Sequence, residues 1–442
     1  MKDYLFFFST LSFFFNSAYK LILLFLISIF YDNNFSTFWL LYITNQSFIF
    51  VFDSSIGPTY VRTFSNILNN DKVKNVKNEL INLIKIYNSL YYIIGAIFSI
   101  LLYPLFIFLN KQIINLIDDQ INLALFSFLL VVSSFLQLII MKGYYLMQGL
   151  NNLLIQKQFD SIQLLFRIII NSLIFICFKS FELILLVDVL ISITFLFKLN
   201  KSIKNLFNEK GFLFTNLPGY SKKTLSMILN PIIKSFLMST GGIAVLNGNA
   251  IIISQFAEPR IISLYLFTEK IFNILKQVSQ LFINSHLPKV YIYFAKKNKN
   301  EILKILTVQL RKAFLFYTII SLTIIFFGNN LFSFFELKFQ LLHFEFLMIF
   351  YLIGILEIHH SGHAQIYMST NKIPFLLPAI YSGILMISIS YILAQNGHEI
   401  IYFLLTQLFV QLSLSNWYPV YKSLKLLNIS FKKYINKLIH VN

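Results

Sequence analysis

Four lysines lie deep inside long apolar runs of the chain, where a charge is most able to serve function. They are Lys20, Lys234, Lys270 and Lys276. A charged side chain at the centre of a bilayer costs roughly 2.5–3.5 kcal/mol on insertion scales, so it normally faces protein or water. Because ammonium groups attract anions more strongly in a low-dielectric cavity than in water, these lysines predict a binding site for an anionic cargo.

Other polar residues accompany the lysines at helical spacing. In the first run, the polar residues on the same helix face as Lys20 are Ser9, Ser12 and Asn16. In the run 261–287, the polar residues on the same face as Lys276 are Glu269, Asn273, Gln280 and Asn284. Side chains three and four positions apart are neighbours on a helix surface. Two such faces could enclose a wet cavity, with Asn16 and Asn273 contacting the cargo. The alternative is that Lys270 and Lys276 pair with Glu269 inside a packed bundle.

Carboxylates and histidines inside the apolar runs are candidates for coupling transport to a proton or sodium ion. The candidates are Glu269, Asp188, Glu357 and His360. His359 and His363 lie close to Glu357 in sequence, but a zinc site needs a further convincing ligand and an open position, so we predict no metal and no cofactor. Polar packing is the alternative for these histidines. Asp53 and Arg167 lie near the expected cytoplasmic boundary, where snorkelling or local pairing accounts for them.

Composition places the chain in the membrane. Of its 442 residues 57% are hydrophobic, and the mean hydropathy is +0.71. The apolar runs reach the ~20 residues with which a helix crosses a bilayer. They predict twelve spans, at residues 5–30, 38–61, 86–109, 121–147, 163–178, 181–198, 225–256, 261–287, 313–335, 344–368, 375–393 and 400–421.

The distribution of basic residues predicts the topology. Most of the 36 lysines and arginines fall in alternate connecting segments, which places both termini in the cytoplasm. The net charge of +18 therefore reflects membrane orientation, and we predict no nucleic-acid partner. We expect an all-α protein with an N-terminal six-helix bundle (1–198), a basic linker (199–224), a C-terminal six-helix bundle (225–421) and a basic tail (422–442). Weak similarity between the halves indicates the internal duplication that is typical of secondary transporters.

Several segments then suggest a family. FDSSIGPTYVRTFSNILNNDK (52–72), MQGLNN (147–152), the unit 246–300 and TNKIPF (370–375) resemble the O-antigen flippases of the Wzx type, within the multidrug/oligosaccharidyl-lipid/polysaccharide (MOP) exporter superfamily. The resemblance implies a fold of two pseudo-symmetric bundles, as in the multidrug exporters. It also implies transport of an undecaprenyl-pyrophosphate-linked oligosaccharide, as an O-antigen or capsule repeat unit, between the leaflets of a bacterial inner membrane.

The same resemblance implies partners and a site. The partners are membrane lipids and the lipid-linked cargo, together with a polymerase and a chain-length regulator of the same pathway. The cationic cavity of the family matches the four lysines by helix and depth. One departure is that Asn247 and Asn249 stand where relatives often have an acidic residue, which argues against ion coupling at that position.

Two other functions are weighed against the flippase. A polysaccharide polymerase or membrane glycosyltransferase needs a large external loop with catalytic groups, and every external segment here is short. The sequence also contains no G-x-x-x-x-G-K-[ST] nucleotide-binding signature. A cation-coupled multidrug exporter of the same fold needs carboxylates for its cargo, whereas the first span carries Lys20.

Overall fold

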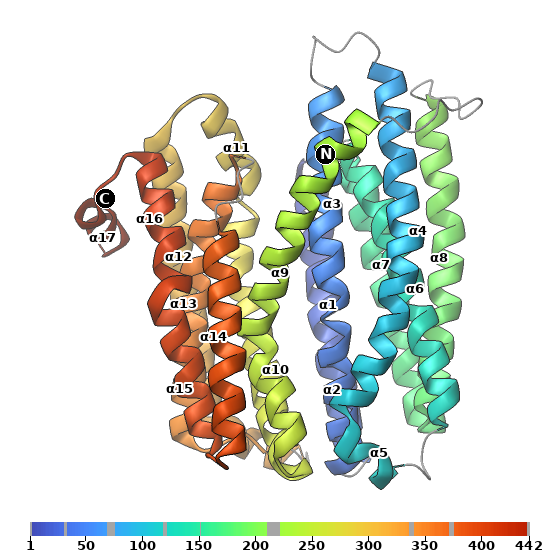
Figure 1. Ribbon diagram of the computed structural model, residues 1–442, viewed down its shortest axis with the longest axis vertical. Helices are drawn as coiled ribbons and strands as arrows, with labels where there is room; N and C mark the ends of the chain where they lie inside the picture. The colour runs from blue at the N-terminus through green and yellow to red at the C-terminus, as the bar shows by residue number, and fades with distance from the viewer. Residues whose placement is uncertain are drawn as a thin grey trace. The chain divides into compact units, whose positions relative to one another are not determined.

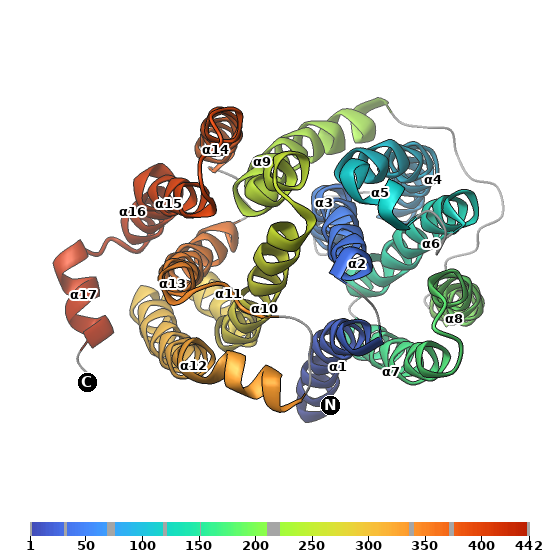
Figure 2. The same ribbon diagram turned by 90° about the horizontal axis from the view of Figure 1, so that it is seen from below.

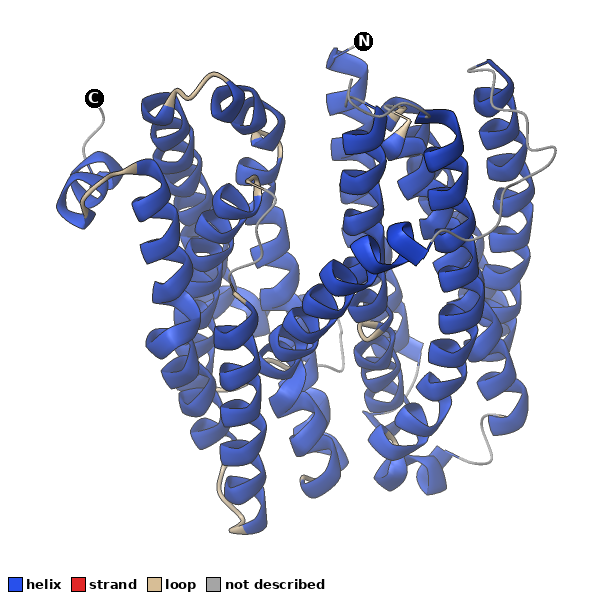
Figure 3. Cartoon of the chain, turned by 45° about the horizontal axis from the view of Figure 1, so that its top comes forward, coloured by secondary structure: helices blue, strands red, loops and turns tan. Residues whose placement is uncertain are grey.

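The computed structural model describes residues 2–30, 33–68, 76–117, 122–150, 152–209, 222–335, 340–370 and 375–439. Within these ranges the chain is helical and contains no strand, as Figure 3 shows. The helices divide into two compact units, residues 1–239 and 240–442. The all-α prediction is confirmed.

The first unit holds the N-terminal helices (Figure 1). These are α1 (Lys2–Phe30), α2 (Asn33–Gln46), α3 (Ile49–Leu68), α4 (Val76–Leu109), α5 (Lys111–Ile117), α6 (Leu123–Gly149), α7 (Leu153–Phe178), α8 (Phe181–Glu209) and the start of α9 (Lys222–Phe256). Helix α6 packs against α3, α4 and α8, while α7 packs against α1 and α8, as the end-on view of Figure 2 shows.

Aromatic rings fill the first unit where α2, α4 and α6 meet. The ring centroids of Phe38, Phe106 and Phe126 lie 5.1–5.3 Å apart, and all three side chains are fully buried. Each large ring removes about 150–250 Å² from solvent, so this cluster fixes the three helices against one another.

The second unit holds the rest of α9 and the C-terminal helices. These are α10 (Pro259–Asn284), α11 (Leu287–Ala295), α12 (Lys299–Phe334), α13 (Phe344–Met368), α14 (Leu376–Gln395), α15 (Ile400–Val410), the π-helical turn η2 (Gln411–Ser415), α16 (Asn416–Leu427) and α17 (Phe431–Ile439). Helix α13 packs against α10, α12, α15 and α16. It therefore forms the centre of this unit.

Small residues bring α9 and α14 into close contact. A Cβ atom built on Gly241 would lie 2.4 Å from the carbonyl oxygen of Ala379, and one on Gly383 would lie 2.9 Å from the carbonyl oxygen of Gly241. Only glycine allows two backbones to approach so closely. Gly241 of α9 therefore allows close packing against α14, whereas Gly242 has open space beside it.

Each of the twelve predicted spans lies on a helix or on an interrupted helix. Eight helices in the described part of the chain are long and apolar enough to cross a membrane, and the other four predicted spans fall on α1, α2 with α3, α8 and α10. Two spans are broken. The second is interrupted between Gln46 and Ile49, and the last is kinked in η2, where Ser413 has φ −80° and ψ −108°.

The predicted linker and tail are partly helical. Helix α8 continues to Glu209, so the first part of the segment 199–224 is helix, and residues 210–221 lie outside the described ranges. The segment 422–442 includes the end of α16 and the short helix α17. The division between the compact units falls inside α9, after Ser239.

The predicted orientation can be read with two reporter fusions. A reporter placed after Lys201, near the end of α8, is expected to report the cytoplasm. One placed after Gly397, in the turn between α14 and α15, is expected to report the opposite side. The reverse pattern from both fusions would invert the topology that the basic residues predict.

Candidate functional site

A buried ion pair joins α10 to α13 in the second unit. The ammonium group of Lys276 forms an ion pair with one carboxylate oxygen of Glu357, and Gln411 donates a hydrogen bond to the other oxygen, with the two atoms 3.0 Å apart. Lys276 also donates to the side-chain oxygen of Asn273 at 2.8 Å. Lys276 and Glu357 are 9% and 6% exposed. Both charges are therefore held out of solvent and compensated within the unit.

A second ion pair lies on α10 itself. The ammonium nitrogen of Lys270 lies 3.3 Å from a carboxylate oxygen of Glu269, although consecutive residues point in different directions around a helix. The long lysine stem makes this contact possible. Pairing inside a packed bundle was the alternative that the sequence left open, and it is what the structure contains. The partners differ from that expectation, because Lys276 pairs with Glu357 and leaves Glu269 to Lys270.

The remaining predicted cargo-binding residues have different environments. Lys234 is exposed on α9, and no ion pair involves it among the described side chains. Asn16 is partly exposed on α1. Lys20 lies in the same helix, but its side chain is outside the described part of the structure. The four lysines thus separate into the paired Lys270 and Lys276 and the unpaired Lys234, with Lys20 undetermined.

Lys142 is a buried cation that lies within the predicted span 121–147, although the count of basic residues grouped it with the cytoplasmic segment that follows. It lies within α6, is 8% exposed, and donates a hydrogen bond of 3.1 Å to the hydroxyl of Tyr92. Its nitrogen also lies 4.2 Å from the centroid of that ring. Since no carboxylate among the described side chains pairs with Lys142, it adds an uncompensated positive charge to the first unit.

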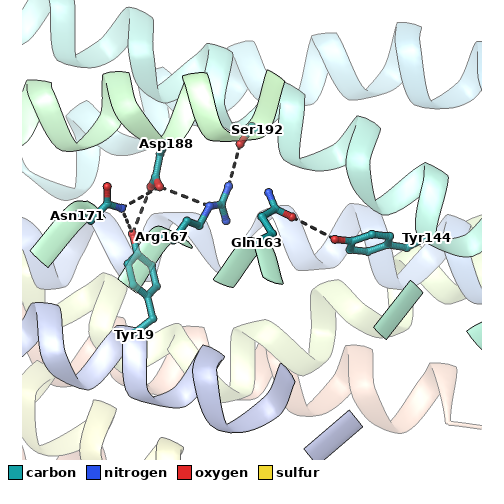
Figure 4. Close-up of polar contacts among 7 residues, drawn as sticks. All are labelled: Tyr19, Tyr144, Gln163, Arg167, Asn171, Asp188 and Ser192. Atoms are coloured by element: carbon teal, nitrogen blue, oxygen red, sulfur yellow. Dashed lines mark hydrogen bonds and ion pairs between the residues drawn. The ribbon is translucent and has the colours of Figure 1, made fainter. Parts of the chain in front are cut away.

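A polar cluster in the first unit contains the predicted ion-coupling residue Asp188 (Figure 4). The carboxylate of Asp188, on α8, lies 3.4 Å from Nε of Arg167 and accepts hydrogen bonds from Asn171 at 2.9 Å and from the Tyr19 hydroxyl at 3.3 Å. The guanidinium of Arg167 also donates to Ser192 at 2.9 Å. Because an arginine stays protonated, it offsets the charge of Asp188 at every physiological pH. This carboxylate already has a cation as its neighbour.

Helical spacing explains how the cluster is positioned. Arg167 and Asn171 are four residues apart on α7, and Asp188 and Ser192 are four apart on α8, so each helix presents two polar groups on one face. The sequence prediction assigned Arg167 to a boundary position, whereas the structure places it near the middle of α7. The matching four-residue spacings on neighbouring helices were the signal that could have predicted this contact.

His359 and His363 of α13 make hydrogen bonds to different residues, although both rings also contact the Tyr434 ring. His359 contacts the Asn416 side chain at 3.3 Å and the Tyr434 hydroxyl at 2.9 Å, and His363 contacts the Ser423 hydroxyl. His360 is partly exposed and has contacts of its own. Glu357 faces Lys276 instead of the histidines. Within the described ranges, no group of three or more His, Cys, Asp or Glu side chains could hold a metal ion.

Asn249, which stands where the resemblance implies an acidic residue, has uncharged hydrogen-bond partners in the structure. Asn249 donates to the carbonyl oxygen of Phe403 at 2.9 Å and accepts from the Ser390 hydroxyl at 2.9 Å. Gln407 donates to the carbonyl oxygen of Val245 at 3.3 Å. These hydrogen bonds connect α9, α14 and α15 without a charged group.

Comparison with known proteins identifies the fold. No family model matches the sequence, and no curated protein is similar to it in sequence. Solved structures are similar along nearly the whole chain. An inward closed structure of the lipid II flippase MurJ has a TM-score of 0.64 and 15% identity, over 98% of this chain and 90% of that one.

Multidrug transporters have the same fold. An inward-facing transporter of the MATE family, in the MOP superfamily, has a TM-score of 0.63 and 12% identity over 93% of this chain and 94% of that one. A MOP-superfamily transporter from Pyrococcus furiosus Vc1 has a TM-score of 0.56 and 12% identity over 97% and 96%. The chain therefore has the fold of MOP-superfamily transporters.

Proposed function

We propose that the protein is a flippase that moves an undecaprenyl-pyrophosphate-linked oligosaccharide from the cytoplasmic to the periplasmic leaflet of a bacterial inner membrane. The observation that carries this proposal is the presence of two cations inside the predicted spans, Lys234 and Lys142, that pair with no carboxylate among the described side chains. The fold shared with a lipid II flippase supports it, since that protein also carries a lipid-linked cargo. The glycan is a repeat unit of O-antigen, capsule or a related surface polymer.

The chemistry of the cargo fits such residues. A pyrophosphate carries strong acceptor oxygens, and a lysine offers three rotatable donors and a compact positive charge. Amides such as those of Asn16 and Asn273 can donate to sugar hydroxyls. The oxygen of Asn273 accepts from Lys276, and its NH₂ group has no hydrogen bond to a described residue. The polyprenyl tail stays in lipid, and alternating access exposes the bound head group to each side in turn.

The lysines differ in whether they must break an ion pair before they can bind an anionic cargo. Lys276 contacts an anionic cargo only by exchanging Glu357 for it, and Lys270 only by exchanging Glu269. Lys234 needs no such exchange, because it is exposed and unpaired among the described side chains. We therefore assign the first contact with pyrophosphate to Lys234 and, with it, to Lys20.

Replacing Lys234 with alanine is expected to reduce cargo transport roughly tenfold or more, because a charge-assisted contact of about 1.5–3 kcal/mol is lost. Lys234→Arg should keep most of the activity, since the charge remains. The control is Lys304→Ala, which removes an exposed lysine of α12 outside the predicted spans. Surface glycan and membrane abundance are measured together; normal transport by Lys234→Ala would remove this residue from the site.

Depleting the protein tests the proposed function itself. The expected result is accumulation of a complete, lipid-linked repeat unit on the cytoplasmic leaflet, because synthesis continues while transfer stops. Truncated glycans would indicate a transferase instead. A complete unit that reaches the periplasmic leaflet but stays unpolymerised would indicate a polymerase.

The pathway's polymerase and chain-length regulator are the protein partners that a flippase implies.

The second candidate is a cation-coupled multidrug exporter, which the similarity to MATE transporters favours. A cationic drug needs carboxylates in its binding site. In the structure, however, Asp188, Glu269 and Glu357 each form an ion pair with a cationic side chain. Sensitivity of a depleted strain to cationic drugs, with normal lipid-linked intermediates, would support the exporter over the flippase.

A further inference from the structure

One buried carboxylate in the first unit has only uncharged partners. Asp53, on α3, is 5% exposed and accepts hydrogen bonds from the Tyr145 hydroxyl at 2.7 Å and the Tyr91 hydroxyl at 3.2 Å. Tyr145 belongs to α6 and Tyr91 to α4. Asp53 is thus held where three helices meet.

The contact with Tyr145 depends on a glycine one turn beyond Asp53. A Cβ atom built on Gly57 would lie 2.0 Å from the Tyr145 ring, far inside contact distance. The ring lies against the bare backbone of α3, which lets its hydroxyl reach back to the residue four positions earlier. The geometry at Asp53 is therefore built by Gly57 and Tyr145 together.

The second unit repeats this arrangement with a different acceptor. A Cβ atom on Gly354 of α13 would lie 1.9 Å from the Tyr317 hydroxyl oxygen, and that hydroxyl donates to the carbonyl oxygen of Phe350, four positions before the glycine. A backbone carbonyl does not titrate. Both units therefore share the packing of a tyrosine against a glycine. The two arrangements differ in the acceptor, which is the Asp53 carboxylate in the first unit and a backbone carbonyl in the second.

The charged and titratable groups around Asp53 leave its negative charge uncompensated. The helices packed against α3 contribute Tyr91 and Tyr145, and Tyr87 lies one turn before Tyr91. Lys142, three residues before Tyr145, donates to the Tyr92 hydroxyl. No ion pair involves Asp53 within the described side chains. An ionised carboxylate without a cation is costly to bury, so such groups tend to bind a proton.

We propose that Asp53 is a proton-binding site that alternates between carboxylate and carboxylic acid during the transport cycle. A proton from solvent forms one O–H bond on the carboxyl group and changes its charge from −1 to 0. Phenol hydroxyls can donate or accept, so one tyrosine reverses its hydrogen bond and both states stay satisfied. The use of this proton to drive transport rests on the proposed flippase function, whereas the binding site itself does not.

Infrared difference spectroscopy of the purified full-length protein in nanodiscs tests the site without any cargo. A pH titration is expected to show the carbonyl band of a protonated carboxyl group, and Asp53→Asn is expected to remove it. Tyr145→Phe should change the pH range over which that band appears, because the carboxylate loses one of its two hydrogen-bond donors. The matched control Tyr317→Phe should leave the band unchanged.

A band that persists in Asp53→Asn, or a Tyr145→Phe titration identical to the wild type, would overturn the assignment. If Asp53→Asn does not fold, the Tyr145→Phe and Tyr317→Phe pair still decides the outcome. Failure of the flippase function would appear separately, as normal lipid-linked intermediates in depleted cells with the Asp53 band intact.

Discussion

Replacing Glu357 with glutamine is expected to destabilise the second unit by about 3–5 kcal/mol, because the substitution leaves the buried ammonium group of Lys276 without a counter-charge. Gln411 would still donate to the new amide oxygen, so the loss comes mainly from the missing charge. Thermal unfolding in detergent, followed by size-exclusion chromatography, measures the change.

A double-mutant cycle separates this pair from general packing effects. Lys276→Met combined with Glu357→Gln removes both charges and keeps similar volumes, so its stability should recover toward that of the wild type. A double variant as unstable as Glu357→Gln alone would contradict the ion pair as the source of the effect. A stable double variant with normal transport would show that Lys276 is structural and does not contact the cargo.

The Arg167–Asp188 pair should give the second large effect, in the first unit. Asp188→Asn leaves the guanidinium of Arg167 with Ser192 as its remaining hydrogen-bond partner among the described side chains, and we expect a loss of about 3–5 kcal/mol. The measurement is again thermal unfolding of the purified protein.

Two variants of Arg167 sharpen this prediction. Arg167→Lys keeps the charge and should lose less stability than Arg167→Met, which leaves Asp188 with Asn171 and Tyr19 as its donors among the described side chains. Equal stability of wild type and Asp188→Asn would mean that water reaches the pair and screens it. In that case Asp188 would regain its place as a candidate for ion coupling.

Sequence patterns predicted the helices better than their contacts. Hydropathy placed the predicted spans on helices because a bilayer sets both the length and the polarity of a crossing helix. The breaks at Ser47 and Ser413 were not predicted, since neither leaves a strong signal in an apolar run. The count of basic residues grouped Lys142 with a connecting segment. In the structure it lies inside α6 and donates a hydrogen bond to the Tyr92 hydroxyl.

The polar partners depend on which helices pack together, and periodicity does not contain that information. Glu269 is adjacent to Lys270 and was a natural partner for both lysines of its helix, whereas Glu357 is 81 residues from Lys276 and reaches it only because α10 packs against α13. Asp53 is likewise 92 residues from Tyr145. Spacing within one helix predicted the polar faces, and tertiary packing decided what each face meets.

The structure also changes how the buried charges are interpreted. The sequence grouped four lysines as one cationic site, but two of them are neutralised by carboxylates within their own unit. Fewer than four lysines are therefore available to an anionic cargo. Lys234 is exposed and forms no ion pair with a described side chain. Asp53, for which the sequence predicted snorkelling or local pairing, accepts hydrogen bonds from two tyrosine hydroxyls and forms no ion pair with any described side chain.

Movement of a lipid-linked oligosaccharide between leaflets can be measured with the purified protein in liposomes. Vesicles are loaded with a fluorescent polyprenyl-pyrophosphate-linked oligosaccharide, and a membrane-impermeant reagent quenches the probe in the outer leaflet. We expect wild-type protein to make the inner-leaflet probe accessible to the quencher. Lys234→Ala should slow this exchange, whereas Lys304→Ala should not. An inner-leaflet fraction that stays protected in vesicles containing correctly folded wild-type protein would show that the protein is not a flippase for this class of lipid-linked oligosaccharide.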